Sequence, residues 1–355
     1  MNNDLLYKEL EDWYEMNHRI LPWRDTTDPY KIWISEIILQ QTRVAQGMEY
    51  YHRLVTRFPD IQSLADAQED EVLLYWQGLG YYSRARNMHK AAQLMKNHEI
   101  FHLSNVECLK LKDEEIFSAL RSMPGVGDYT AGAIASFAFN LPYPALDGNV
   151  YRVLSRLYDC EIAFDTTQGK KHFRQLAVDL LDREHPRLFN SAIMELGALH
   201  CVPTAPDCHT CPLNTWCKAL ANNTVELLPV RKPRPKVRDR YLEYTIYITP
   251  ERMTLIYQRK GNDIWKHLYE FPVQEIHSLE DAHSGFSLKF RGRKFLDLTH
   301  VLSHQKLHAR FVIKNVSELP EIPDTVVVSL SDLDNYAFSR LTLKAIEKLL
   351  ITYHS

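Results

Sequence analysis

The sequence contains few cysteines and no long apolar run. Only six of its 355 residues are cysteines, which excludes the small disulfide-stabilised proteins. No apolar stretch approaches the roughly 20 residues that a helix needs to cross a bilayer, and MNNDLLYKEL at the start lacks the apolar core of a signal peptide. Internal repeats and low-complexity tracts are absent. We therefore expect a soluble, cytoplasmic, monomeric protein with no membrane partner.

Charge is unevenly distributed along the chain. The formal net charge is −3, which by itself does not favour a nucleic-acid-binding protein. Residues 1–224 carry a net charge of −7, with 22 basic and 29 acidic side chains, whereas residues 225–355 carry +4, with 20 and 16. Any nucleic-acid contact must therefore rely on a local basic face or on backbone amides.

Helical patterns fill the first two-thirds of the chain. In the segment from Pro29 to Thr42, apolar residues recur at helical spacing. Further helical patterns are EVLLYWQGL, SRARNMHKAAQLMKN, DYTAGAIASFAF, GNVYRVLSRLY and FRQLAVDLLDR. Short connections rich in Pro, Gly or Asp join most of them. Residues 1–224 are therefore predicted to form a compact, mainly α domain.

A basic segment separates this domain from a second one. Between Arg231 and Arg240 there are six basic residues, one acid and two prolines, which suits an extended linker over residues 225–240. Beyond it lie short β-type runs, YLEYTIYIT, MTLIYQR, SLKF, LHARFVIKN and DTVVVSL, and then a helical pattern, SRLTLKAIEKLL. Residues 241–355 are therefore predicted to form a smaller α+β domain.

Four of the six cysteines occupy one short segment. Cys201, Cys208, Cys211 and Cys217 follow the spacing C-x6-C-x2-C-x5-C, so four thiolates could surround one metal centre without a histidine. Zinc sites favour paired C-x-x-C units, and only one such pair is present, whereas an iron–sulfur cluster tolerates uneven spacing. We predict an iron–sulfur cluster in residues 201–217, with a zinc site or unliganded cysteines as the alternatives.

The segment LRSMPGVGDYTA contains a tight turn between two helical patterns. Pro124, Gly125, Val126 and Gly127 form this turn, and its glycines permit positive φ and leave the amides uncovered. Backbone N–H groups at a helix N-terminus can bind a phosphate without a lysine. The turn is therefore a candidate DNA-phosphate site in an acidic domain; an ordinary connection between helices is the alternative.

Two acidic residues have contrasting surroundings. Glu36 lies among apolar residues of a predicted helix, where burial would raise the pKa of its carboxyl and keep it protonated. Asp147 precedes the helical segment GNVYRVL, where backbone N–H donors would hold an N-cap aspartate ionised. Opposite pKa shifts are therefore predicted. A partly exposed glutamate and an aspartate that only caps its helix are the simpler alternatives.

Several motifs together resemble the MutY family, adenine DNA glycosylases of the helix-hairpin-helix superfamily, over essentially the whole chain. The matching motifs are LPWR at Leu21–Arg24, SEIILQQT at Ser35–Thr42, GLGYYSRARN at Gly78–Asn87, MPGVGDYTAG at Met123–Gly132, LDGNVYRVL at Leu146–Leu154, MELGALHC at Met194–Cys201, and the cysteine loop. The resemblance implies a helix-hairpin-helix domain with one 4Fe–4S cluster, followed by a Nudix-like domain. The implied partner is double-stranded DNA with adenine opposite 8-oxoguanine or guanine.

The resemblance also implies roles for four residues. Glu36 would protonate adenine at N7 and later assist water, while Asp147 would stabilise the sugar cation or bond to it transiently. Tyr129 occupies the position of a lysine in bifunctional relatives such as endonuclease III, so a monofunctional enzyme that leaves an abasic site is expected. Asn149 would help to hold the sugar or Asp147.

Two further residues match positions that enter the DNA when the base is flipped out of the duplex. Gln40, one turn beyond Glu36 and so on the same helix face, matches the inserted glutamine of the family. Tyr81 matches its aromatic wedge. A surface glutamine and a core tyrosine are the alternatives.

The walls of the adenine pocket match the family only in part. Arg19, Trp23 and Arg24 resemble one wall. Ser191 replaces a longer polar side chain at the far wall, which leaves the composition of that wall open. Glu195, in the motif MELGAL, is expected to be structural.

The second domain is expected to read the base opposite adenine. In the segment HVLSHQKL, Leu302, Ser303 and His304 resemble the family loop that contacts 8-oxoguanine, with Leu302 in place of phenylalanine. A β-hairpin with a hydrogen-bonded histidine is the alternative. The strand pattern and WKHLYEFP resemble Nudix hydrolases, but the Glu-rich magnesium motif is lacking, so nucleotide hydrolysis is not expected.

Two other functions are compatible with parts of the sequence. The first is a glycosylase for oxidised pyrimidines or for thymine opposite guanine. Tyr129, the second domain and its LSH loop (Leu302, Ser303 and His304) disfavour it. The second is a non-catalytic DNA-binding protein whose cluster senses redox state. The presence of both Glu36 and Asp147 disfavours this alternative.

Overall fold

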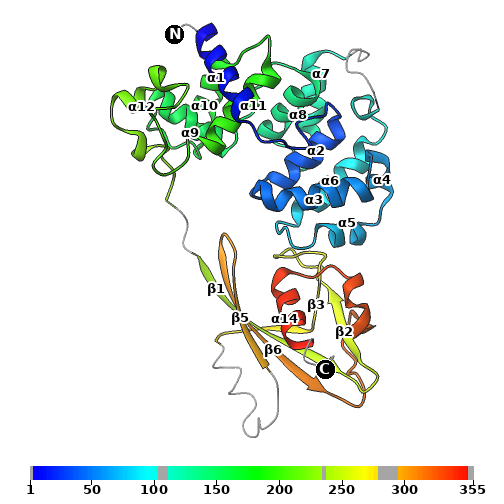
Figure 1. The fold of residues 1–355 in the computed structure, drawn as a ribbon. Helices are drawn as coiled ribbons and strands as arrows, with labels where there is room; N and C mark the ends of the chain where they lie inside the picture. The colour runs from blue at the N-terminus through cyan, green and yellow to red at the C-terminus, as the bar shows by residue number, and fades with distance from the viewer. Residues whose placement is uncertain (1–2, 103–110, 234–236, 279–294, 351–355) are drawn as a thin grey trace. The chain divides into compact units, whose positions relative to one another are not determined.

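A computed structural model describes residues 3–102, 111–233, 237–278 and 295–350 (Figure 1). The chain forms two compact units, Met1–Ala65 with Lys90–Pro233, and Asp66–His89 with Arg234–Ser355. The second unit thus includes a short stretch of the predicted helical domain. The domain boundaries proposed from the sequence, at residues 224 and 240, stay predictions. Within the described ranges, no helix is long and apolar enough to cross a membrane.

The first two-thirds of the chain are helical, as predicted. The helices are α1 (Asn3–Asn17), α2 (Pro29–Leu39), α3 (Val44–Arg57), α4 (Ile61–Asp66), α5 (Glu69–Trp76), α6 (Ser83–Met95), η1 (Glu99–Phe101), α7 (Asp113–Ser122), α8 (Asp128–Phe139), α9 (Gly148–Tyr158), α10 (Thr167–Leu180), α11 (Pro186–Leu199), η3 (Asn214–Trp216), α12 (Lys218–Ala221) and η4 (Val225–Leu227). Within the first unit, α2 packs against α3 and α8, and α11 packs against α1 and α9.

Two helices of the first unit are buried along most of their length. Nine of the 11 residues of α2 and ten of the 12 residues of α8 are buried. Both sequences are apolar on nearly every face, which favours an interior position. A second core forms between α1, α9, α10 and α11, where Leu6, Val153, Phe173 and Ile193 are buried. The two cores fix the start of α9 relative to α2 and α8.

Helix α2 is shorter than the sequence pattern predicts. It ends at Leu39, and Gln40 is its C-cap residue, with ψ at 108°. Gln41 has a left-handed backbone, with φ at 59°. The helix therefore ends before Thr42, but its C-cap residue Gln40 keeps a helical φ of −55°, so Gln40 lies one turn beyond Glu36 on the same face, as predicted.

The α+β architecture predicted for the C-terminal part is confirmed. Its elements are β1 (Arg238–Ile248), β2 (Met253–Gln258), β3 (Tyr269–Glu270), β4 (Val273–Ile276), β5 (Phe295–Val301), β6 (Gln305–Asn315), β7 (Thr325–Ser329), η5 (Leu330–Asn335) and α14 (Arg340–Leu350). A four-stranded sheet has the order β4-β1-β6-β5, and a three-stranded sheet has the order β3-β2-β7. The β1–β6 pair is parallel, with Leu242 beside Ala309, and the other pairs are antiparallel.

Strand β1 shows the period of two expected for a sheet with one buried face. Leu242, Tyr244, Ile246 and Ile248 are buried, and the residues between them are partly exposed. The strand begins at Arg238, inside the segment that the sequence predicts to be a linker. The predicted run SLKF, at residues 287–290, lies outside the described residues.

The close packing of α9 against α11 depends on one glycine. A Cβ atom at Gly197 would lie 2.7 Å from the Cβ of Asn149 and 3.0 Å from its carbonyl carbon and oxygen. Side chains essentially never approach this closely, so only glycine fits here. Gly197 therefore determines how closely the first turn of α9 approaches α11.

We predict that Gly197→Ala destabilises the first unit by about 1–3 kcal/mol, because the added methyl group must displace Asn149. Gly261→Ala is the matched control, since nothing lies within 4 Å of a Cβ atom built there. Urea unfolding followed by circular dichroism measures both variants. An unchanged unfolding midpoint in Gly197→Ala would show that α9 and α11 are not packed this closely.

Candidate active site

The carboxyl group of Glu36 is buried inside the first unit. Only 5% of the residue is exposed, and its Oε2 accepts a hydrogen bond of 2.8 Å from the Tyr129 hydroxyl. Burial raises the pKa of Glu36 to about 7, whereas the Tyr129 hydrogen bond and the charge of Arg24 lower it, and the charge of Asp147 raises it. The raised pKa predicted from the sequence is confirmed.

Asp147 is the N-cap residue of α9, as the sequence predicts. Its Oδ1 accepts a hydrogen bond of 2.8 Å from the Val150 N–H, and its Oδ2 accepts one of 2.8 Å from Asn149 Nδ2. Burial nevertheless raises the pKa of Asp147, although these hydrogen bonds and the charge of Arg152 lower it. The predicted opposite pKa shifts are therefore wrong, because both carboxyl groups are removed from water.

Tyr129, the second residue of α8, faces both acids. Burial raises the pKa of its hydroxyl well above the usual value, and the charges of Glu36 and Asp147 raise it further. The phenol therefore stays neutral and donates its proton to Glu36 in a hydrogen bond. Tyr129 cannot serve as an amine nucleophile, and in the part of the chain that the structure describes no lysine lines this site.

Glu36 and Asp147 line the same cavity, of about 620 Å³. Such a volume lies within the range of small-molecule pockets. The residues that line it include the four positions predicted for catalysis, the three predicted for one adenine wall, and Gln40: Arg19, Trp23, Arg24, Glu36, Gln40, Tyr129, Asp147 and Asn149. The sequence motifs therefore converge in space, although they come from α2, α8, α9 and the segment after α1.

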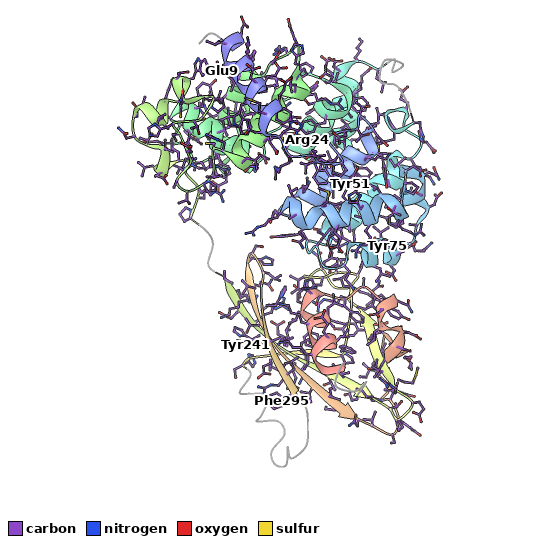
Figure 2. The ribbon with its side chains drawn as sticks, viewed as in Figure 1. Glu9, Arg24, Tyr51, Tyr75, Tyr241 and Phe295 are labelled. Carbon is purple, nitrogen blue, oxygen red and sulfur yellow. The ribbon has the colours of Figure 1, made fainter. Side chains whose placement is uncertain are left out.

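The walls of the cavity are held by an ion pair and by aromatic packing. Arg19 binds Glu195 through two contacts of 2.6 and 2.8 Å, and its backbone N–H donates to the same carboxylate. This pairing lowers the pKa of Glu195 against the effect of burial. Trp23 is buried and packs edge-on against Tyr51, with ring centroids 5.2 Å apart. Arg24 (labelled in Figure 2) lies 5.0 Å from the ring centre of Phe137.

Ser191 does not line the main cavity. It lines a neighbouring cavity of about 150 Å³, which shares only Trp23 and Arg24 with the main one. On α11, Met194, Glu195 and Ala198 line the main cavity instead. The far wall that the sequence leaves open is therefore formed by residues one turn further along this helix.

Arg152 and Arg231 also line the cavity, and sequence reasoning missed both. Arg152 could have been found from its spacing, because it lies three residues after Asn149 on a helix that begins at the site. Arg231 belongs to the segment predicted to be a linker, and no pattern there indicates a role at the site.

Arg152 connects the acid site to the cysteine loop. Its Nη2 donates to Asn149 Oδ1 at 2.9 Å and to the Gly197 carbonyl at 2.5 Å, and its Nε donates to the Cys201 carbonyl at 2.7 Å. Asn149 in turn donates to Asp147. Hydrogen bonds thus run without a break from the carboxylate of Asp147 to the backbone of the first loop cysteine.

The four loop cysteines surround one small space, and none of them forms a disulfide. Burial raises the pKa of Cys211 to about 12, so its thiolate requires a compensating positive charge. Among the described residues, no three metal-binding side chains close on a single ion. The four sulfurs therefore line one shared space.

Arg156 supplies a buried positive charge beside these thiols. It is 2% exposed, and its Nη1 lies 3.3 Å from Cys201 Sγ. The same guanidinium donates to the carbonyls of Val202, Pro203 and Val225, at 2.7 to 3.0 Å. Arg156 therefore organises the cysteine loop by binding the backbone carbonyls of the loop, and its charge favours negative charge on the loop sulfurs.

The Pro124–Gly127 turn joins α7 to α8, as predicted. Only Gly125 has a positive φ, at 81°; Gly127 is the N-cap of α8, with φ at −93°. Of the two glycines that permit positive φ, only Gly125 therefore uses this freedom. The Val126 N–H donates to the Met123 carbonyl within the turn, so its amide is not uncovered as predicted. No atom lies within 4 Å of a Cβ built at Gly127, so that position is open.

A second cavity, of about 410 Å³, lies within the second unit. Tyr81 lines it and is 47% exposed, so it is not a core tyrosine. Leu302, Ser303 and His304 line the same cavity, in the turn between β5 and β6. The Ser303 hydroxyl lies 3.2 Å from His304 Nδ1. The residues predicted as wedge and as lesion-reading loop therefore share one cavity.

Two family models match the chain. Residues 34–179 match the HhH-GPD superfamily of base excision DNA repair proteins, and residues 244–348 match the NUDIX domain. The chain also resembles solved structures of a thermostable thymine-DNA glycosylase (TM-score 0.53, 23% identity, 62% of this chain and 97% of that one) and of an endonuclease III–DNA complex (TM-score 0.50, 20% identity, 63% and 98%). These likenesses support the fold of the first two-thirds of the chain.

Curated relatives extend the match to most of the chain. An adenine DNA glycosylase of Buchnera aphidicola (subsp. Baizongia pistaciae) is 37% identical over 77% of this chain and 74% of its own length. One from Buchnera aphidicola (subsp. Schizaphis graminum) is 33% identical over 86% of both chains. The human adenine DNA glycosylase is 38% identical over 59% of this chain and 38% of its own length. The chain belongs to the MutY family of adenine DNA glycosylases and is a DNA N-glycosylase.

Proposed function

We propose that this glycosylase removes adenine paired with 8-oxoguanine, and less efficiently adenine paired with guanine, and leaves an abasic site. The observation that carries the proposal is the shared cavity of Glu36 and Asp147, with Tyr129 between α2 and α9 in place of an amine. One carboxyl group has a pKa near neutrality, and the other is held by hydrogen bonds from backbone and side chain. This pairing suits cleavage of an N-glycosidic bond.

The first step is proton transfer to the base. Protonated Glu36 donates to N7 of the flipped adenine, so that the electron pair of the glycosidic bond leaves with a neutral base. The sugar then carries oxocarbenium character, which the carboxylate of Asp147 stabilises at short range. Glu36, now ionised, takes a proton from the water that attacks C1′. Glu36 is thereby reprotonated, and the product is an abasic site.

The DNA contacts follow from the two cavities. A base inside a duplex cannot reach Glu36, so double-stranded DNA must release the adenine into the main cavity. Gln40, at the C-cap of α2, would fill the gap, and exposed Tyr81 would intercalate on the other strand. The uncrowded position of Gly127, the N-cap of α8, would suit a phosphate. Leu302, Ser303 and His304 would read 8-oxoguanine.

The cysteine loop fits a 4Fe–4S cluster. Four thiolates supply the ligands, and buried Arg156 offsets their negative charge. Bound iron would keep Cys211 deprotonated despite its burial. When bound, the cluster would order the loop from Cys201 to Cys217. We assign the cluster a structural role and route no step of base excision through it.

The substrate and the product are tested in one gel assay. We predict that alkali reveals strand breaks only in the adenine strand of duplexes with adenine opposite 8-oxoguanine or guanine, since none of the described residues that line the cavity is a lysine that could cut the backbone. Asp147→Asn should lose this activity, by at least about a hundredfold, because the sugar cation loses its carboxylate. Duplexes with thymine opposite guanine or with an oxidised pyrimidine are the controls. Breaks without alkali, or excision of a pyrimidine, would contradict the proposal.

The pH dependence of excision tests the role of Glu36. Because the acid form donates the proton and its pKa is about 7, the single-turnover rate should fall as pH rises above that value. Tyr129→Phe removes a hydrogen bond that lowers this pKa. The fall in rate on the alkaline side of the pH–rate profile (its alkaline limb) should therefore move to higher pH. Glu36→Gln should lose the limb together with the activity. A limb that stays in place in Tyr129→Phe would mean that another group titrates.

The cluster assignment is tested by colour and metal content. The purified protein should be yellow-brown and contain iron rather than zinc. Arg156→Gln should lower the iron retained per chain, because the thiolates lose their buried counter-charge. The matched control is Arg183→Gln, at an exposed position. A colourless wild-type protein with one zinc per chain would refute the cluster.

A further inference from the structure

The turn from Asp263 to Trp265 forms part of the wall of the 410 Å³ cavity in the second unit. Trp265 begins the motif WKHLYEFP, which resembles Nudix hydrolases, but the motif gives it no role in base recognition. The indole of Trp265 lies 5.8 Å from the imidazole of His300, tilted by 59°. His300 itself lines the cavity, as do Tyr81 and Ser303. Aromatic and imidazole rings therefore approach one cavity from three separate segments.

The backbone of this turn is unusual. Trp265 and His267 are both left-handed, with φ at 59° and 66°. Bulky side chains rarely adopt this conformation, and it persists only where the surroundings enforce it. Here the Leu268 N–H donates to the Trp265 carbonyl at 3.0 Å, and the His267 N–H donates to the Arg259 carbonyl at 2.7 Å. The fold thus holds Trp265 in an unfavourable backbone conformation.

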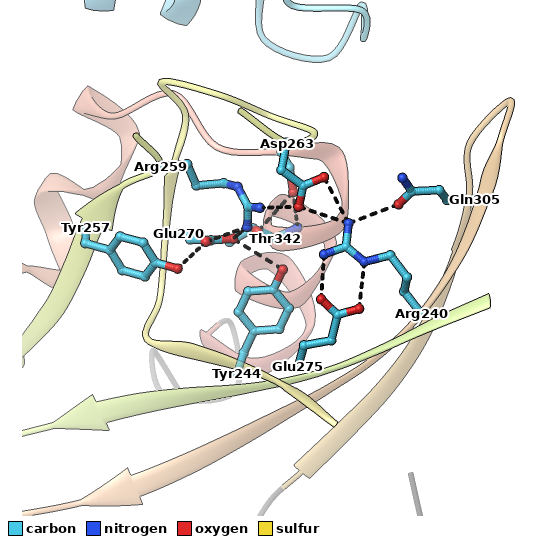
Figure 3. A network of polar contacts seen from close by, with 10 residues as sticks. Arg240, Tyr244, Tyr257, Arg259, Asp263, Glu270, Glu275, Gln305 and Thr342 are labelled. Atoms are coloured by element: carbon cyan, nitrogen blue, oxygen red, sulfur yellow. Dashed lines mark hydrogen bonds and ion pairs between the residues drawn. The ribbon is translucent and has the colours of Figure 1, made fainter. Parts of the chain in front are cut away.

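An ion-pair network holds the turn at Asp263 (Figure 3). Arg240 Nη1 contacts both carboxylate oxygens of Asp263, at 3.0 and 2.9 Å, and Arg259 Nη2 contacts one of them at 3.0 Å. Arg259 also binds Glu270, which is 2% exposed, at 2.7 and 2.8 Å. A second carboxylate, Glu275, makes two contacts of 2.9 and 2.7 Å with Arg240.

Arg240 also reaches the loop on the other side of the cavity. Its Nη1 donates to Gln305 Oε1 at 3.1 Å. The Gln305 carbonyl accepts a hydrogen bond of 2.7 Å from the Leu302 N–H, which closes the turn that carries Ser303. One guanidinium therefore contacts the anchor of each segment, Asp263 for the Trp265 turn and Gln305 for the LSH loop.

We propose that Trp265 is a specificity-determining residue that contacts the purine opposite adenine, and that Arg240 is the positioning residue that fixes Trp265 and the LSH loop around it. The inference rests on the proposed function and extends it to residues outside the LSH loop. The occupant is a flat base with polar edges, because the cavity combines ring faces with a serine hydroxyl and the carboxylate of Asp263. Both residues act on the choice of opposite base rather than on bond cleavage.

The experiment compares single-turnover excision of adenine opposite 8-oxoguanine and opposite guanine. Trp265→Ala should reduce the ratio of the two rates about tenfold, the size of one lost base–aromatic contact, and Trp265→Phe should restore most of it. Arg240→Gln should reduce the same ratio. The matched control is Arg310→Gln, which breaks an Arg–Asp pair with Asp297 on the same sheet, at 2.7 Å, away from the cavity. The ratio of the two excision rates should not change in Arg310→Gln.

Tryptophan fluorescence supplies a readout that a general loss of folding would not reproduce. The probe is a duplex with 8-oxoguanine opposite a cleavage-resistant 2′-fluorinated adenosine. Binding should change the fluorescence of the wild type more than that of Trp265→Phe, and the difference should shrink with guanine in place of 8-oxoguanine.

The outcomes separate the inference from the proposed function. A wild type without preference for 8-oxoguanine would overturn the proposed function, and this inference with it. A wild-type preference that survives in Trp265→Ala and in Arg240→Gln would overturn the inference alone. A matching loss of preference in Arg310→Gln would also overturn it, because the effect would then come from the stability of the sheet.

Discussion

The burial of one carboxyl group, that of Glu36, is the constraint on which the site depends. Removed from water, this acid would be neutral at most pH values, and the Tyr129 hydrogen bond and the Arg24 charge bring its pKa back to about 7. At that value the group can give up a proton and take one back in the same turnover. A more exposed carboxyl would already be ionised, and one without these partners would be a poor base. The apolar sequence of α2 therefore has a chemical as well as a structural role.

Helix α9 joins the chemistry to the cysteine loop. Asp147 caps it, Asn149 and Arg152 follow within its first two turns, and Arg156 lies one turn further on. The first three share hydrogen bonds, while Arg152 and Arg156 both contact Cys201. A helix keeps these spacings fixed, so the carboxylate and the loop are held by one rigid element. The position of Asp147 thus depends on residues that never meet the base.

The sequence predicts the parts of the site that depend on local chemistry. Asp147 as a helix cap and Glu36 as a buried acid follow from residue type and spacing, whereas the convergence of the motifs is implied by the resemblance to the family. The pKa direction of Asp147 could not be predicted, because it depends on how far the cavity excludes water, which is a tertiary property. The end of α2 at Leu39 could not be predicted for a related reason: the helical periodicity continues past the point where the backbone leaves the helix.

Other features depend on contacts between distant segments, and no local pattern indicates them. Ser191 is in its own cavity because α11 turns Met194 toward the acids instead. Arg240 reads as one basic residue among six in a linker, yet in the fold it lies in strand β1 and binds two carboxylates. Its charge was visible in the sequence, but its partners, 23 and 35 residues away, were not.

The proposed recognition of the base opposite adenine requires more than a single hydrogen bond. Guanine presents an acceptor at N7, whereas 8-oxoguanine presents an N7–H donor and an added oxygen. A serine hydroxyl both donates and accepts, so Ser303 alone could rotate to satisfy either base. Discrimination arises when one base leaves a fixed polar or aromatic group without its partner, since specificity is a difference between two affinities. A cavity whose walls are held by the ion-pair network of Arg240 and Arg259 would supply that rigidity, whereas a hairpin turn held only by its own backbone would adapt to both bases.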